Sequence, residues 1–194
     1  MPFFEVDIEK PDFDRETFEY VVLYICSKVD DLRNLSKTKL HKILYYVDRE
    51  VYLETGEALT GERYVANEYG PTSDHLEDVL SDLEEKGLLS HLTREGTSNK
   101  FGTFKQNIFV AKESPDVDEM FTASQVQLLD EVTRKISEDL TSEEISDISH
   151  DIVWRAARKG EEIPYYTSLL QVTKPSERSE DLAWAREKAE ERKA

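Results

Sequence analysis

Apolar residues recur at helical spacing along several segments of this chain, and the clearest case lies between residues 36 and 55. Its apolar stripe consists of Leu40, Ile43, Leu44, Val47 and Val51. The other faces are occupied largely by charged side chains, namely Lys39, Lys42, Asp48, Arg49 and Glu50. Ser36 can cap the N-terminus of such a helix, and Gly56 can end it in the left-handed conformation that glycine adopts most easily. We therefore predict an amphipathic helix packed on a core.

Similar stripes and capping signals predict further helices on both sides of this segment. The expected helices are residues 15–32, residues 73–86, and two or two and a half more that begin with the capping boxes Thr122–Gln125 and Thr141–Glu144 and end before Pro164. Most of the chain is therefore expected to be helical.

Short strands are predicted between these helices. Residues 88–92 and 101–110 form an expected hairpin around a turn at residues 96–99, and residues 63–66 form a short strand before a turn at Gly70–Pro71. Helix, glycine, strand, turn and strand follow one another in the order of a winged helix. The predicted fold class is mainly α, with about six helices around one core and a small central β hairpin.

The ends of the chain differ from its middle. Residues 1–13 contain two prolines and predict an extended N-terminal arm, whereas residues 14–172 form the expected single helical domain. Residues 173–194 are dense in charge and predict a C-terminal extension that is either an exposed helix or disordered until bound.

The charge balance restricts the partners. Asp and Glu number 42 against 25 Lys and Arg, which gives a net charge of -17, so the average surface repels phosphates and acidic lipid headgroups. A basic partner would be attracted, although solubility or adaptation to a salty cytoplasm explains the same excess. Because no stretch could span a bilayer or act as a signal peptide, we expect a cytoplasmic protein without membrane contact. Cys26 is the single cysteine, which excludes an intrachain disulfide and predicts a buried packing role.

The winged-helix order invites a DNA-binding hypothesis, in which residues 73–86 would enter the major groove. That segment carries six acidic residues and one lysine, whereas groove entry depends on neutralising phosphates. Only the hairpin, with Arg94, Lys100 and Lys105, is locally basic. We therefore favour a winged-helix-like shape used for protein contact, and a DNA-binding regulator remains the alternative.

No motif predicts catalysis, a metal ion or a cofactor. The four histidines have no spacing that would place two on one helical face as metal ligands, and no glycine-rich phosphate loop is present. Ser149, His150 and Asp151 resemble the members of a catalytic triad, but consecutive residues on a helix point about 100° apart and cannot hydrogen-bond in series. The sequence predicts a protein that is not an enzyme and binds no cofactor.

Aromatic residues are the better candidates for recognition. Adjacent residues on a helix diverge, so at most one of Tyr45 and Tyr46 can face the centre of the core, and the other is free for a partner. Tyr69 stands beside the rigid Gly70–Pro71 corner as a second candidate contact. His150 and Trp154 are four residues apart and predict an aromatic pair, which is either a packing seam or a partner anchor. For the tyrosines, half-buried packing is as good an interpretation as binding.

Two segments resemble the Panacea domain, the SocA-like antitoxin family. The first is Lys39, Leu40, Lys42, Ile43, Leu44, Tyr45 and Tyr46, followed by Tyr69, Gly70 and Pro71; the second is Ser149, His150 and Trp154. Asn67–Glu68 and Thr72–Ser73, which flank the Tyr-Gly-Pro, depart from the family pattern and suggest a divergent member with its own partner.

The resemblance implies an antitoxin that binds a co-expressed toxin, or an adaptor that delivers the toxin to a ClpXP-type protease. It implies that residues 39–71 build the common scaffold, while variable surfaces such as residues 73–86 and 174–194 set partner identity. The expected partner is a cognate toxin, with a basic toxin favoured by the acidic charge.

Overall fold

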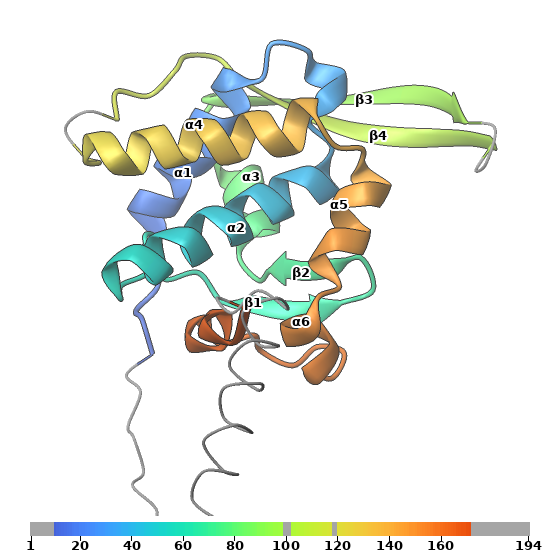
Figure 1. The fold of residues 1–194 in the computed structure, drawn as a ribbon. Coiled ribbons are helices and arrows are strands. Elements are labelled where there is room, and N and C mark those ends of the chain that lie inside the picture. The colour runs from blue at the N-terminus through green and yellow to red at the C-terminus, as the bar shows by residue number, and fades with distance from the viewer. Residues whose placement is uncertain (1–9, 99–101, 118–119, 172–194) are drawn as a thin grey trace, which may run out of the picture.

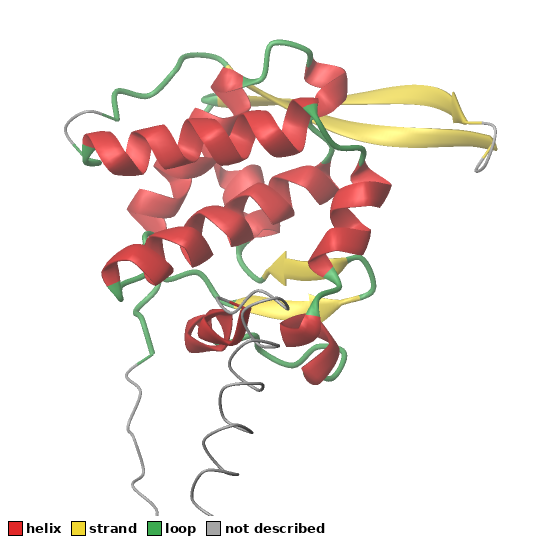
Figure 2. Cartoon of the chain, in the orientation of Figure 1, coloured by secondary structure: helices red, strands yellow, loops and turns green. Residues whose placement is uncertain are grey.

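The computed structural model describes residues 10–98, 102–117 and 120–171 (Figure 1). Within these ranges six α-helices are present: α1 (Arg15–Lys28), α2 (Lys37–Thr55), α3 (Leu76–Glu85), α4 (Ala123–Glu138), α5 (Ser142–Ser149) and α6 (Ile152–Ala156). The strands are β1 (Tyr64–Asn67), β2 (Gly70–Ser73), β3 (Leu89–Ser98) and β4 (Gly102–Ala111), with 3₁₀ turns at Leu32–Asn34 and Tyr165–Gln171. The predicted mainly α fold is confirmed, and Figure 2 shows two separate two-stranded sheets where the sequence indicated one hairpin.

Helix α2 lies at the centre of the fold and contacts α1, α4, α5 and β2 (Figure 1). The predicted capping is confirmed: Ser36 Oγ accepts a hydrogen bond from Lys39 N at 3.2 Å, and Gly56 ends the helix with a φ of 80°. The whole apolar stripe is buried. Lys39, Lys42 and Asp48 are buried as well, so the expectation that charged residues occupy faces away from the packed interior is wrong for these three. Other elements surround α2 and cover its polar faces too.

The hairpin β1–β2 corrects the prediction of a turn at Gly70–Pro71. Both residues belong to β2, where Gly70 pairs with Asn67 and Pro71 with Ala66, and the turn consists of Glu68 and Tyr69. Proline is tolerated here because a two-stranded sheet consists only of edge strands. Since residues 70–73 are used in β2, helix α3 begins at Leu76 instead of at residue 73.

The hairpin β3–β4 extends away from the helices (Figure 1). Its register runs from Leu89 opposite Ala111 to Ser98 opposite Gly102, so residues 96–98 continue the strand where the sequence predicted a turn. Gly96 pairs with Phe104, whose ring would lie 2.6 Å from an added Cβ, so this glycine makes room for an aromatic cross-strand neighbour. Residue 99 of the predicted turn lies outside the described residues.

The helical block after the hairpins begins as predicted. Thr122 with Gln125 and Thr141 with Glu144 both form complete capping boxes at the starts of α4 and α5. Helix α5 ends at Ser149, and α6 begins at Ile152 after the side chain of Asp151 accepts from Val153 N and Trp154 N. At the other end of the chain, α1 stops at Lys28, and the Asp31 side chain caps the 3₁₀ turn that follows.

The core contains side chains from all six helices, and Cys26 lies in it with 2% of its surface exposed. Burial raises the pKa of the Cys26 thiol to about 12. In the described part of the chain, no helix combines the length and apolarity needed to cross a membrane. The predicted C-terminal extension lies outside the described residues, as does all but the last part of the N-terminal arm.

Candidate functional site

The Lys42 ammonium group is the centre of a buried junction between α2 and β2. Its Nζ donates a hydrogen bond to the Pro71 carbonyl oxygen at 2.6 Å, and the residue is 1% exposed. Burial lowers the pKa of Lys42 to about 7, because the charged form has lost its hydration. Two residues of the predicted motif, 29 positions apart, are therefore joined directly.

Gly70 completes this junction because only hydrogen fits at its α-carbon. An added Cβ would lie 2.2 Å from Ser149 Oγ and 2.9 Å from Lys42 Nζ. The glycine also has a φ of 93°, which L side chains rarely adopt. On α5, Ser146 Oγ donates to the Tyr69 carbonyl oxygen at 3.2 Å, which ties the hairpin turn to the same helix. The Tyr-Gly-Pro segment is thus packed between α2 and α5.

Lys39 makes a second buried link from the same helix. Its Nζ donates to the Ser137 carbonyl oxygen near the end of α4 at 2.8 Å, and burial lowers the pKa of Lys39. A lysine that donates to a backbone carbonyl satisfies an acceptor that the end of a helix leaves free. Both lysines of the motif therefore join α2 to neighbouring elements instead of facing solvent.

The aromatic candidates divide into buried and accessible side chains. Tyr45 is buried, its ring contacts those of Tyr46 and Tyr64 at centroid distances of 5.3 Å, and burial raises the pKa of its hydroxyl. Tyr46 is half-buried, and burial raises its pKa to about 12. Tyr69 is 64% exposed at the hairpin turn. The structure thus places one tyrosine of the adjacent pair in the core and leaves the other, with Tyr69, accessible.

His150 and Trp154 lie together as predicted, but not on one helix. Their ring centroids are 3.9 Å apart across the break between α5 and α6. Trp154 Nε1 donates to the Asn67 carbonyl oxygen at 3.0 Å, which fixes the pair against the turn of β1–β2. His150 Nε2 is buried and has no hydrogen-bond partner within the described residues. The pair therefore packs beside the hairpin that carries Tyr69.

The family profile described as antitoxin SocA-like, Panacea domain, matches residues 40–155, more than half of the chain. The chain belongs to the SocA-like antitoxin family. No curated protein and no solved structure matches it. The matched range begins inside α2 and ends inside α6, so this antitoxin domain includes both hairpins and the helices that enclose Lys42 and Gly70. The two sequence segments that carried the resemblance thus meet at one junction in space.

Within this antitoxin domain, a buried acidic cluster beside β1 was missed by the sequence reasoning. Asp48 accepts hydrogen bonds from Thr60 N at 2.8 Å, Thr60 Oγ1 at 2.5 Å and the Tyr64 hydroxyl at 2.7 Å. Burial raises the pKa of Asp48 to about 6. Glu62, fully buried, accepts from Asp74 N at 2.7 Å and from His75 N at 3.1 Å. No spacing in the sequence distinguishes these acids from exposed ones.

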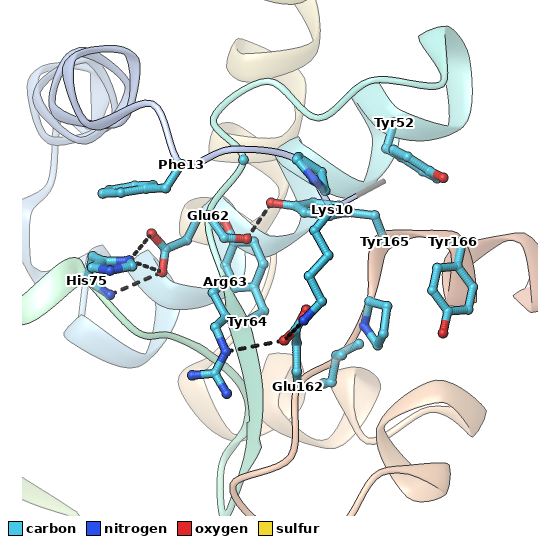
Figure 3. A pocket seen from close by; sticks show the side chains of 14 residues that line it. Lys10, Phe13, Tyr52, Glu62, Arg63, Tyr64, His75, Glu162, Tyr165 and Tyr166 are labelled. Atoms are coloured by element: carbon cyan, nitrogen blue, oxygen red, sulfur yellow. Dashed lines mark hydrogen bonds and ion pairs between the residues drawn. The ribbon is translucent and has the colours of Figure 1, made fainter. Parts of the chain in front are cut away.

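A pocket of about 590 Å³ lies next to this cluster (Figure 3). Its charged side chains pair with one another: Lys10 Nζ lies 2.7 Å and Arg63 Nε 3.4 Å from Glu162, and His75 Nδ1 lies 3.0 Å from Glu62. Among the described residues, no group of three or more His, Cys, Asp and Glu side chains is placed to hold a metal ion. The charged side chains of this pocket are thus already engaged with one another.

The serine and histidine of the apparent triad contact different neighbours and not each other. Ser149 Oγ is buried and donates to the Ser146 carbonyl oxygen at 2.8 Å, while His150 faces Trp154. Asp151 is engaged with the amides of α6. A nucleophile needs a base within hydrogen-bond reach, and these three residues form no such series.

A second groove, of about 580 Å³, lies between α2, α4 and α5. Apolar side chains line most of it: Leu128, Val132, Ile136, Leu140, Ile145 and Ile148. Tyr46 and Arg49 enter it from α2. Of the residues predicted as contacts, Tyr46 is thus the one that lines an open groove.

Proposed function

We propose that this chain is an antitoxin that neutralises a co-expressed toxin by binding it directly. The observation that carries the proposal is the match to the SocA-like antitoxin family over residues 40–155. In this proposal the protein performs no chemistry: it covers the active surface of the toxin in a stable non-covalent complex, and growth resumes because the toxin no longer reaches its target.

The burial of the motif supports a division between scaffold and contact residues. Lys39, Lys42, Gly70 and Pro71 are packed inside the domain and act as scaffold, because none of them lies at the surface and both lysines already donate to backbone carbonyls within the domain. Contact with the toxin must come from side chains that the fold leaves accessible, such as Tyr69. Tyrosine at an exposed turn offers a large contact area with few rotatable bonds.

The charge of the chain favours a basic toxin. The net charge of -17 attracts a positively charged partner and speeds encounter at low ionic strength. Part of this negative charge lies on the exposed face of α3, which carries Glu77, Asp78, Glu84 and Glu85. The same acids oppose the alternative of a DNA-binding regulator, since this is the helix that would have to enter the major groove.

The proposal is tested by co-expression with the product of the adjacent reading frame. We expect the neighbouring protein to arrest growth alone, the present chain to restore growth, and the two to co-purify as one species. The amount of toxin in the rescued cells separates two mechanisms: an unchanged amount fits masking, whereas a fall that requires a ClpXP-type protease fits delivery for degradation. Absence of both toxicity and association would contradict the proposal.

A further inference from the structure

The groove between α2, α4 and α5 contains a guanidinium group whose Nε has no hydrogen-bond acceptor among the described residues. Arg49 projects from α2 into this groove, and its side chain is only 13% exposed. Its Nε is buried and forms no hydrogen bond with any described residue. The nearest carboxylate oxygen, Glu50 Oε1, lies 3.8 Å away and therefore beyond hydrogen-bond distance. The guanidinium carbon stands 5.5 Å from the centroid of the Tyr46 ring.

Three other arginines of the described chain make closer ion pairs than Arg49 does. Arg15 Nη2 lies 2.5 Å from Asp82, Arg134 Nη1 lies 3.5 Å from Asp139, and Arg63 pairs with both Asp74 and Glu162. These guanidinium groups are much more exposed than that of Arg49, so they need a partner less. A largely desolvated guanidinium without an acceptor is unfavourable unless a carboxylate or another acceptor reaches it.

The surroundings of Arg49 specify what can reach it. The groove floor is apolar and includes the half-buried Leu128 and Val132 and the buried Ile145. Ile148 on α5 is 53% exposed and continues the apolar surface to the edge. A free anion or small polar molecule would gain little from this floor, whereas a peptide segment with apolar side chains would cover it.

We propose that this groove binds a segment of the toxin that presents apolar side chains to α4 and α5 and one Asp or Glu carboxylate to Arg49. The inference rests on the antitoxin function proposed above and names the surface that binds the toxin. Arg49 pairs with the carboxylate through its guanidinium group, which also lies against the Tyr46 ring. Besides Arg49, the charged residues that line the groove are Glu50, Glu131, Asp151 and Lys135. Since the three carboxylates outnumber Lys135, they favour basic residues beside the carboxylate of the toxin segment.

Two groove variants and two matched controls test this assignment by toxin affinity. Ile148→Arg places a charge on the exposed apolar edge, and Leu92→Arg is its control, because Leu92 is 51% exposed on β3 outside the groove. Arg49→Met removes the guanidinium, and Arg134→Met removes an exposed arginine from α4 that does not line the groove. Each groove variant should weaken binding by about 10-fold or more, and each control by less than about 3-fold.

Affinity is measured with purified proteins by calorimetry, after circular dichroism has shown that each variant keeps the helix content and melting behaviour of the wild type. Hydrogen exchange of the wild-type complex adds a test that needs no substitution. We expect toxin binding to slow amide exchange at the exposed ends of α4 and α5 more than in β3–β4.

The outcomes separate the two proposals. A wild-type protein that neither rescues growth nor binds the toxin overturns the antitoxin function, and with it the groove assignment. Wild-type binding with unchanged affinity in both groove variants, or protection confined to β3–β4, overturns the groove assignment alone. A free protein that is dimeric and becomes monomeric in Ile148→Arg without loss of toxin affinity assigns the groove to a second copy of the chain and also overturns the inference.

Discussion

Lys42 and Arg49 project from the same helix, about two turns apart, and both bring a positive charge into a largely buried position. Lys42 reaches the Pro71 carbonyl oxygen at 2.6 Å and lies within a family motif. Arg49 lines an apolar groove, and its Nε has no hydrogen-bond partner in the described chain. Burial alone therefore does not show whether a charged group is hydrogen-bonded within the domain: Lys42 is, whereas Arg49 has, among the described residues, only an ion pair with Glu50 at 3.8 Å.

Gly70→Ala gives the largest expected effect on stability, because it disturbs the buried junction around Lys42. The added Cβ would meet Ser149 Oγ and Lys42 Nζ at a φ of 93°, so we expect a loss of about 3 kcal/mol in the free energy of unfolding. Urea denaturation measures it. Gly56→Ala is the control, since Gly56 also has a positive φ but open space around it, and should cost about 1 kcal/mol. Equal losses would show that the packing around Lys42 is not tight.

Tyr64→Phe and Tyr45→Phe compare a partnered hydroxyl with an unpartnered one on two rings in contact. The Tyr64 hydroxyl donates to Asp48 at 2.7 Å, so its removal should cost about 2 kcal/mol. The Tyr45 hydroxyl is buried without a partner among the described residues, so its removal should change stability by less than about 0.5 kcal/mol. Thermal and urea unfolding of both variants measure this. A larger loss in Tyr45→Phe would contradict the comparison.

Lys42→Met should alter how stability depends on pH. The pKa of Lys42 is about 7 in the folded protein and near 10.5 in the unfolded chain, so folding releases a proton between these values. The unfolded chain then binds more protons, and rising pH favours the folded wild type by on the order of 1 kcal/mol per pH unit, an effect that the variant lacks. Urea unfolding of both proteins at pH 7, 8, 9 and 10 measures the difference. Parallel curves would refute it.

Arg49→Met should have the smallest effect on the free protein. Because its Nε makes no hydrogen bond to lose, replacing the side chain with an apolar one of similar length should change stability by less than about 0.5 kcal/mol, or raise it slightly. Urea denaturation without toxin measures this, beside the affinity loss expected with toxin. A destabilisation as large as that of Gly70→Ala would make Arg49 a structural residue like Lys42.

Local signals account for the part of the fold that was predicted correctly. The caps of α2, α4 and α5 rest on neighbours within a few residues, so Ser36, Thr122 and Thr141 identify these helices from sequence. Gly70 and Pro71 were misassigned because their strand pairing depends on where β1 ends, and a glycine–proline pair is a turn signal in most contexts.

The site could be predicted only in part, because its contacts are distant in sequence. The aromatic pair of His150 and Trp154 was expected, yet it forms across a helix break instead of along one helix. The burial of Lys42 depends on a carbonyl 29 residues away, and the missing hydrogen bond of Arg49 Nε depends on how other elements pack around it. Such absences leave no pattern in the sequence.

The reaction rate of the Cys26 thiol reports whether the protein is folded. Cys26 is the single cysteine of the chain, and in the core its pKa of about 12 leaves almost no reactive thiolate at neutral pH. A disulfide reagent such as 5,5′-dithiobis(2-nitrobenzoate) can then react only when the core opens, so its rate reports the population of the opened protein. The rate of this colorimetric reaction thus ranks the variants by how often their core opens, with or without bound toxin. No label has to be introduced.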